Sequence, residues 1–252
     1  TLPLALEGRD VLGLAQTGTG KTAGFALPIL ERILGETRAG PRALVLAPTR
    51  ELAAQILAEF KLLSRFAHVK LLNIYGGVGQ RPQVQGLRKR PDVIVACPGR
   101  LLDLIEQGHA KLDRVEMFVL DEADQMFDMG FMITIRKILE YLPAKRQNLL
   151  FSATMPEAVR HLADEMLEDP EVVELAHKKP LHLIEQTIYP VHRKLRQQLL
   201  EYLLEHDNVT RAIVFMRTKH GARKLAERLN KGPKRVVGLQ GNMSQFQREK
   251  VM

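Results

Sequence analysis

The sequence predicts an α/β protein built on a doubly wound parallel sheet with helices on both faces. Short apolar runs rich in Val, Ile and Leu recur without polar alternation, as expected for strands that are buried on both faces. An amphipathic stretch follows each run, and this alternation of strand and helix is typical of right-handed βαβ units. The predicted strands cover residues 10–15, 42–48, 70–76, 92–98, 115–122 and 148–154.

Helices are expected between these strands because apolar side chains recur there at helical spacing. Residues 22–36 and 50–66 are two such segments, and in the second Leu52, Ile56 and Phe60 lie on one helix face. A helix over residues 157–167 and a short strand near 172–175 follow the last of the six strands. Together these elements predict a first domain over residues 1–175.

A linker and a second α/β pattern are expected after the first domain. Residues 176–186 contain Pro180 and a pair of lysines and are predicted to form an interdomain linker. In the second domain, residues 187–252, we expect too few strands and helices to close an α/β domain. We therefore expect this domain to be truncated and the chain to be a fragment cut at both ends. The expected strands are 187–191, 212–216 and 235–241, and the expected helices are 193–206 and 220–230.

The composition excludes several classes of protein. Of 252 residues, 45% are apolar and 26% charged, which is ordinary for a globular protein and excludes disordered or collagen-like chains. The single cysteine, Cys97, excludes a disulfide framework and a thiolate-rich zinc site. No apolar run approaches the roughly 18 residues that a membrane span requires. We therefore expect a cytoplasmic protein without a membrane partner.

The charge indicates an anionic partner such as nucleic acid, since the formal net charge is +8. Residues 1–165 contain 21 Lys and Arg against 19 Asp and Glu, whereas residues 166–252 contain 16 against 10. The excess of positive charge is therefore expected mainly in the linker and the second domain.

The strongest chemical signal is the segment AQTGTGKT, which follows a predicted strand and opens a predicted helix. This is the position of a phosphate-binding loop, although Ala15 stands where the strict pattern has Gly. Gly18 and Gly20 let backbone N–H groups surround phosphate oxygens, and the helix adds its positive end. Lys21 is expected to reach the β- and γ-phosphates and Thr22 to hold Mg²⁺. The predicted nucleotide-binding residues are Ala15, Gln16, Thr17, Gly18, Thr19, Gly20, Lys21 and Thr22.

A second signal is the apolar run 115–120 that ends in the acids of DEAD, residues 121–124. Asp121 is placed at the carboxyl end of a strand, where it would hold Mg²⁺ through water. Glu122 would position or deprotonate an attacking water. Ligands of open α/β sheets bind beyond the carboxyl ends of the strands, so we expect both signals at one edge. Alone, the acids could instead be an ordinary acidic helix start.

Five segments follow one another in the order AQTGTGKT, PTREL (48–52), PGR (98–100), DEAD (121–124) and SAT (152–154). In this order they resemble the motifs of the first core domain of a bacterial DEAD-box ATP-dependent RNA helicase. DMGF (128–131) agrees with this, and IVFMRTK (213–219) and GNMSQFQR (241–248) are similar to elements of the second domain. The resemblance covers nearly the whole chain. It implies RecA-like folds, ATP and Mg²⁺ as cofactors, and ATP hydrolysis coupled to local RNA unwinding and remodelling of RNA–protein complexes.

The resemblance also implies roles for individual residues, with Lys21, Asp121 and Glu122 as the catalytic group. Ser152, Ala153 and Thr154, together with Asp124, match the group that couples the ATP state to RNA remodelling. From the residues alone, each arginine of the RNA motifs could instead bridge within the fold, and Thr154 could be a helix cap. The implied RNA-binding positions are Pro48, Thr49, Arg50, Glu51, Gly76, Gly77, Pro98, Gly99, Arg100, Gln245 and Arg248.

The sequence departs from the family pattern at several positions. Cys97 stands where the family usually has Thr, and we expect it to be structural, because no His lies near it in the sequence. LQGN (239–242) replaces a His-Gly-Asp-like triplet, and Phe246 and Gln247 replace small or acidic residues. The adenine-reading glutamine motif and the arginine finger are not within these residues, so weak nucleotide binding and very slow hydrolysis are expected.

Two alternatives to the helicase remain open. One is an ATP-gated RNA clamp or scaffold with little unwinding, and the other is a DNA-directed relative, against which PTREL, DEAD and SAT together argue. The expected partner is single-stranded or short duplex RNA, bound with tolerance of sequence and sensitivity to salt. Ribosome-assembly or RNA-decay proteins are further expected partners, and a monomer is expected.

Overall fold

The chain folds into two compact units, Thr1–His177 and Lys178–Met252, in the computed structural model. The structure describes residues 1–15, 18–35, 40–174, 185–206, 209–232 and 235–251. The predicted linker, residues 176–186, lies outside the described residues except for its last two positions.

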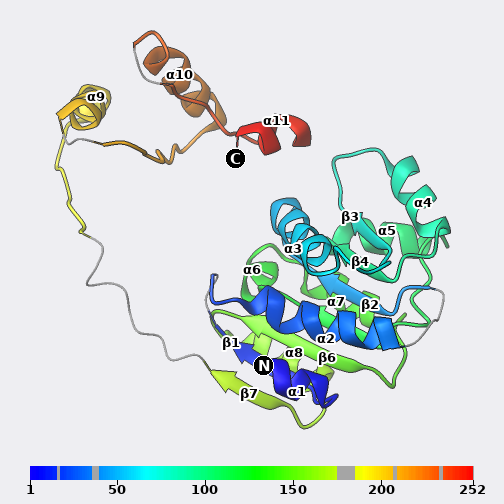
Figure 1. Ribbon diagram of the computed structural model, residues 1–252. Helices are drawn as coiled ribbons and strands as arrows, with labels where there is room; N and C mark the ends of the chain where they lie inside the picture. The colour runs from blue at the N-terminus through cyan, green and yellow to red at the C-terminus, as the bar shows by residue number, and fades with distance from the viewer. Residues whose placement is uncertain (16–17, 36–39, 175–184, 207–208, 233–234, 252) are drawn as a thin grey trace. The chain divides into compact units, whose positions relative to one another are not determined.

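The first unit is a seven-stranded sheet with helices on both faces (Figure 1), which confirms the predicted fold class. The strands are β1 (Val11–Leu14), β2 (Ala43–Leu46), β3 (Leu71–Ile74), β4 (Val93–Ala96), β5 (Met117–Leu120), β6 (Gln147–Ser152) and β7 (Glu171–Glu174). The helices are α1 (Leu2–Leu6), α2 (Lys21–Gly35), α3 (Arg50–Leu63), α4 (Gln80–Arg88), α5 (Pro98–Glu106), α6 (Ala123–Asp128), α7 (Met132–Leu139) and α8 (Glu157–Met166).

The strands lie in the order β3-β4-β2-β5-β6-β1-β7, and all neighbouring pairs are parallel. All seven strands therefore end at one edge of the sheet, where the predicted motifs follow β1, β2, β3, β4, β5 and β6. The strand order reverses next to β1, since β1 lies between β6 and β7. Ligands bind beyond the carboxyl ends at such a reversal in open α/β sheets.

Alternate residues of each central strand supply two separate hydrophobic cores. In β2, Leu44 and Leu46 pack with α5, α6, α7 and α8, whereas Val45 packs with α1, α2 and α3 on the opposite face. Both sets of side chains are fully buried. The absence of polar alternation in the predicted strands therefore reflects burial on both faces.

Aromatic packing beneath the phosphate loop requires a glycine in β1. Gly13 pairs with Phe151 of β6 across the sheet, and a Cβ atom built on Gly13 would lie only 2.5 Å from Phe151 Cδ1. The Phe151 ring also lies 5.6 Å from the ring of Phe25 in α2, centroid to centroid. Gly13 thus lets the Phe151 ring lie against the strand that leads into the loop.

Buried charged side chains hold the opposite edge of the sheet together. The Asp10 carboxylate accepts hydrogen bonds from the backbone N–H groups of Asn148 (2.7 Å) and Glu168 (2.9 Å), which joins the starts of β1 and β6 to the segment before β7. Arg42 forms two 2.9 Å hydrogen bonds with Glu116 and donates to the carbonyl of Arg32 at the end of α2. These contacts satisfy polar groups that would be costly to bury alone.

In the second unit the helices agree with the prediction and the strands do not. The described helices are the 3₁₀ helix η2 (Arg193–Leu195) followed by α9 (Arg196–His206), α10 (Lys219–Leu229) and α11 (Gln245–Val251). No strand occurs among the described residues of this unit, so the strands predicted at 187–191, 212–216 and 235–241 are wrong. A strand exists only when its backbone pairs with a neighbour, and here Ile188, Ile213 and Phe215 remain 91%, 84% and 93% exposed.

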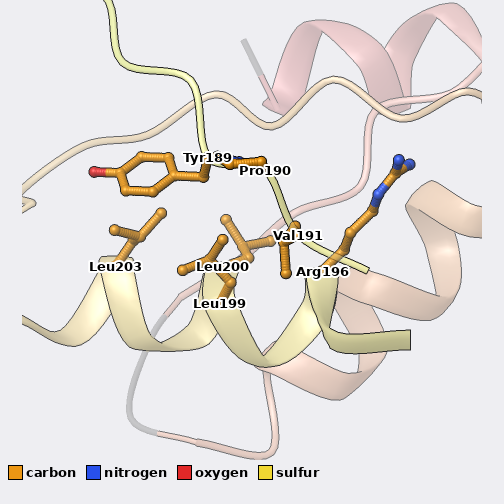
Figure 2. A pocket seen from close by; sticks show the side chains of 7 residues that line it. All are labelled: Tyr189, Pro190, Val191, Arg196, Leu199, Leu200 and Leu203. Atoms are coloured by element: carbon orange, nitrogen blue, oxygen red, sulfur yellow. The ribbon is translucent and has the colours of Figure 1, made fainter. Parts of the chain in front are cut away.

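An apolar pocket of about 670 Å³ lies within the second unit (Figure 2). Tyr189, Pro190 and Val191 line one side, and the leucines of α9 line the other. No carboxylate, cysteine or histidine lines this pocket, so it contains none of the groups predicted for catalysis. None of the described helices is both long and apolar enough to cross a membrane.

Replacing Gly13 with Ala is expected to lower the free energy of unfolding by about 1–3 kcal/mol, because the new methyl group overlaps the Phe151 ring. Urea denaturation of the full chain measures the change. Gly35→Ala is the matched control, since no atom lies within 4 Å of a Cβ built there. Equal stability of the two variants would contradict this account of the core.

Candidate functional site

The phosphate loop leaves β1 beside the end of β6. The N–H group of Ala15 donates a 3.0 Å hydrogen bond to the carbonyl of Ser152, so the predicted loop and the SAT segment start from one point. Gly18 and Gly20 have φ values of +88° and +82°, in the region that favours glycine. No atom lies within 4 Å of a Cβ built on either, so the loop backbone faces open space. Gln16 and Thr17 lie outside the described residues.

Lys21 and Asp121 meet at this edge, as the sequence predicted. Lys21 is the first residue of α2, and its Nζ donates a 3.0 Å hydrogen bond to the carbonyl of Ala15. The same Nζ lies 3.8 Å from Asp121 Oδ1, and the two side chains are only 9% and 3% exposed. The ammonium group and the carboxylate therefore balance each other's charge in a site that largely excludes water.

The buried carboxylate of Asp121 fits the predicted magnesium site. Burial raises the pKa of Asp121 to about 6, against the lowering effect of the Lys21 charge. Its Oδ1 has no hydrogen-bond partner among the described residues, and such an oxygen is the hard ligand that Mg²⁺ takes. No group of three or more His, Cys, Asp or Glu side chains that could hold a metal occurs in the described part of the chain. Mg²⁺ would therefore need nucleotide phosphates in addition to Asp121 and Thr22.

Glu122 is held in a backbone conformation that non-glycine residues seldom adopt. Its φ and ψ are 57° and 54°, and it precedes the first residue of α6. A side chain in this left-handed region costs about 1–2 kcal/mol. Such strain concentrates at functional sites, and here it turns the chain sharply between Asp121 and the start of α6.

A hydrogen-bonded group joins the DEAD and SAT segments. The Asp124 carboxylate accepts hydrogen bonds from the N–H (2.9 Å) and the hydroxyl (2.8 Å) of Thr154. The Asp124 N–H donates to Ser152 Oγ (3.1 Å), which itself donates to the Thr154 carbonyl (2.6 Å). Burial acts to raise the pKa of Asp124, but the bonds from Thr154 outweigh it and hold the pKa below its ordinary value. The predicted coupling residues Asp124, Ser152 and Thr154 thus form one unit, and Ala153 lies between the last two.

The three segments predicted to bind RNA meet around the loop between β3 and α4. The Arg50 guanidinium, from the start of α3, occupies the space where a side chain on Gly77 would lie, and Gly77 has a φ of +73°. Arg100, from the start of α5, donates a 3.2 Å hydrogen bond to the carbonyl of Val78. Arg100 therefore bridges within the fold, which is one of the two interpretations of the sequence, whereas Arg50 packs against the Gly77 backbone.

The remaining residues of these segments occupy helix starts. The Thr49 side chain accepts a 3.2 Å hydrogen bond from the N–H of Leu52 and so caps α3, where Pro48 precedes it and Glu51 follows in the first turn. Pro98 is the first residue of α5, with Gly99 next to it. No atom lies within 4 Å of a Cβ built on Gly99, so this helix start is open.

Cys97 is a structural residue, as expected. It precedes α5, is 8% exposed and makes no side-chain capping bond. Burial raises the pKa of its thiol to about 11, although the Arg50 charge acts in the opposite direction. The thiolate that nucleophilic chemistry needs is therefore scarce at neutral pH.

The second-unit residues Gln245 and Arg248 lie on α11. The Gln245 side chain is 5% exposed and Arg248 is partly buried. Their predicted contact with RNA stays a prediction.

Sequence reasoning did not find Gln83, which holds in place the loop between β3 and α4 (residues 75–79), called the glycine loop below. Its Oε1 accepts a 3.1 Å hydrogen bond from the Tyr75 N–H, and its Nε2 donates to the carbonyls of Tyr75 (3.1 Å) and Gly79 (3.3 Å). The helix has two more glutamines that are not buried, Gln80 and Gln85, so residue type alone does not mark the bracing one. Only the position of α4 against β3 selects it.

The fold and the site define an α/β protein of the phosphate-loop class, in which a Gly-rich loop and an acidic strand end meet at the carboxyl edge of a parallel sheet. Comparison with known proteins refines this class. The family model described as DEAD/DEAH box helicase matches residues 1–162, and the chain belongs to this family.

Curated relatives match over the whole chain. The DEAD-box ATP-dependent RNA helicase CshA of Geobacillus kaustophilus is 44% identical over 253 residues, which are 54% of that protein. The ATP-dependent RNA helicase CshA of Listeria monocytogenes is 43% identical and covered to 48%, and the RNA helicase CrhR of Synechocystis is 40% identical and covered to 51%. The chain thus spans about half the length of the curated relatives it matches.

A solved structure supports the fold. The DEAD box protein from the hyperthermophile Methanococcus jannaschii is 37% identical, with a TM-score of 0.66. The match covers 99% of this chain and 67% of the other.

Stability should depend on pH through Asp121. Its raised pKa means that the unfolded carboxyl ionises near pH 3.8 and the folded one only near about 6. Stability contributed by the neutral carboxyl is therefore present below pH 4 and is lost as the pH rises to about 6. Without Mg²⁺ or nucleotide, the free energy of unfolding of Asp121→Asn relative to that of the unmodified chain should rise by about 2 kcal/mol between pH 4 and pH 8. Urea titrations at these pH values measure it, and a constant difference would contradict the shift.

Gly77→Ala is expected to lower the free energy of unfolding by about 1–3 kcal/mol, because alanine is strained at this φ and displaces the Arg50 guanidinium. Adding Arg50→Ala to Gly77→Ala should restore part of the lost stability, because Arg50→Ala removes the guanidinium with which the new methyl group clashes. A double-mutant cycle in urea measures this coupling. Additive effects would show that Arg50 and Gly77 are independent.

Proposed function

We propose that this chain is the nucleotide-binding part of an ATP-dependent RNA helicase. The protein would couple ATP binding and hydrolysis to local unwinding of RNA duplexes and to remodelling of RNA–protein complexes. The observation that carries the proposal is the hydrogen-bonded group of Asp124, Ser152 and Thr154, because it links the acids of the nucleotide site to the strand end beside the phosphate loop. The names of the curated relatives support RNA as the substrate.

The residues of the site suit the binding of a nucleoside triphosphate. Lys21 would exchange the Ala15 carbonyl and Asp121 for oxygens of the β- and γ-phosphates, and the N–H groups at the start of α2 would add further donors. Thr22 and Asp121 would hold Mg²⁺, which offsets phosphate charge when bound. Glu122, on the turn after Asp121, would orient or deprotonate the attacking water.

Coupling to RNA would run through contacts that nucleotide binding disturbs. When Lys21 leaves Asp121, the charges next to Glu122 and Asp124 change. The Asp124 carboxylate accepts two hydrogen bonds from Thr154, so a shift of the DEAD segment would move the SAT segment as well. A contiguous hydrogen-bonded unit of this kind can transmit a two-state change.

Recognition of RNA would use the loop around Gly77 and the starts of α3 and α5. Arg100 holds this loop through the Val78 carbonyl and Arg50 packs against Gly77. The open helix start at Gly99 offers N–H donors to a phosphate. Contacts of this type position a nucleic-acid backbone without reading the bases. Binding would therefore tolerate different sequences and weaken with salt.

We further infer that the 252-residue chain hydrolyses ATP slowly. It spans about half the length of its curated relatives, and the described residues of its second unit contain no strand. An arginine finger from outside the nucleotide-binding domain would complete the site, and such a residue is worth about 10³–10⁵ in turnover in phosphoryl-transfer enzymes.

Hydrolysis measured under single-turnover conditions, with the chain in excess over radiolabelled ATP, tests the site. Glu122→Gln is expected to slow the residual hydrolysis by about 10²–10⁴-fold without weakening nucleotide binding. Lys21→Ala should abolish binding of a fluorescent ATP analogue, and Lys137→Ala on the distant α7 is the control.

The two claims fail in different ways in this assay. Hydrolysis that survives both substitutions would overturn the assignment of the site. Fast steady-state turnover stimulated by RNA would leave the site intact and contradict only the inferred slow hydrolysis.

A further inference from the structure

A second basic surface lies at the other edge of the first unit's sheet. We call it the basic corner and define it by the exposed residues Lys61, Arg65, Phe66, Lys70, Arg88, Lys89 and Arg90. They come from the end of α3 with the segment that leads into β3, and from the end of α4 with the segment that leads into β4. None of them belongs to the nucleotide site or to the three segments around the glycine loop.

Backbone pairing brings the two halves of the basic corner together. β3 and β4 are parallel neighbours that start at Leu71 and Val93. Just before them, the Asp92 N–H donates to the Lys70 carbonyl (2.7 Å), and Asp92 Oδ2 accepts from the Lys70 N–H (2.7 Å). The segments that carry Arg65 and Arg90 therefore meet at the amino ends of these strands.

Charge in the first unit is strongly segregated toward this corner. Residues 61–92 contain seven Lys and Arg, six of them in the corner, against one acid, Asp92, although residues 1–165 as a whole contain 21 against 19. The rest of residues 1–165 therefore contains 14 against 18 and is acidic. Asp92 accepts its hydrogen bond from the Lys70 N–H and is the single acid of this stretch, so the six cations of the corner outnumber the acids of residues 61–92.

The corner also presents an exposed aromatic ring. Phe66 is 90% exposed, and the Arg65 guanidinium lies 4.5 Å from its ring centroid. A cation held over one side of the ring restricts its motion and leaves the other side to solvent. Cations interspersed with an aromatic side chain form the kind of surface that binds single-stranded nucleic acid.

We propose that the basic corner is a second binding surface for single-stranded RNA, in addition to the one in the proposed function. Its Lys and Arg side chains contact phosphates, and an unpaired base stacks on Phe66. The corner lies at the amino ends of the strands, whereas the nucleotide and RNA motifs lie at the carboxyl ends. Its contribution is therefore independent of ATP, and it holds a distal part of a strand that is engaged elsewhere.

The test measures binding of a fluorescein-labelled 20-nucleotide oligouridylate to the full chain by anisotropy, without nucleotide, over a range of salt concentrations. Arg88→Gln with Lys89→Gln should weaken binding and reduce the slope of log K against log salt by about 1.4, because each phosphate contact contributes about 0.7 for single strands. Lys137→Gln with Arg160→Gln is the control, since it removes the same charge from exposed positions elsewhere in the unit.

Phe66 has its own test. Phe66→Ala should weaken binding at least about fivefold and Phe66→Trp should preserve it, because stacking needs an aromatic face. Tyr141→Ala, another exposed aromatic change, should have no effect. All variants change exposed side chains, so urea denaturation should give unchanged stability.

Equal RNA affinity and equal salt slope for the Arg88/Lys89 and the Lys137/Arg160 variants would overturn the proposal and leave an acidic protein surface as the partner of the corner. A loss of affinity in Phe66→Ala that Phe66→Trp does not restore would overturn the stacking contact. Failure of the helicase proposal has a different signature, namely ATP hydrolysis that survives both Glu122→Gln and Lys21→Ala.

Discussion

The parallel pairing of β1 with β6 is the contact on which the rest of the site depends. The ladder runs from Val11 opposite Leu149 to Leu14 opposite Ser152, and the Ala15–Ser152 hydrogen bond extends it by one step. Residues separated by more than 130 positions thus leave the sheet side by side. A register shift of one residue would turn Phe151 to the other face and move the phosphate loop away from the SAT segment. Gly13 permits this pairing because a larger residue would push the ring away.

The sequence predicted the first unit well because local and tertiary requirements agree there. Each strand is an apolar run that is buried on both faces, and each motif follows the end of a strand. The parallel arrangement then brings Lys21 to Asp121 and Asp124 to Thr154 without any information beyond strand order. This part of the site can be predicted from the type of each residue, its position after a strand and the order of the strands.

The features that escaped prediction depend on tertiary contacts. Gln83 is distinguished from neighbouring glutamines only by facing Tyr75, and the left-handed turn at Glu122 contradicts the preference of that residue type. The second-unit strands failed for a related reason. Apolar β-branched runs such as residues 212–216 favour the extended conformation of a strand. A strand also needs a neighbouring backbone to pair with, and no described residue pairs with these runs.

The uneven distribution of charge in the first unit has a consequence beyond the residues that touch a ligand. A nearly neutral body with a cationic corner and an acidic remainder has a permanent dipole moment. Approaching polyanions exert a torque on such a body within a Debye length, roughly 8–10 Å at physiological salt. The unit would be rotated before contact, so that encounters with a nucleic acid begin from one preferred side. This orienting effect weakens as salt shortens the range of the field.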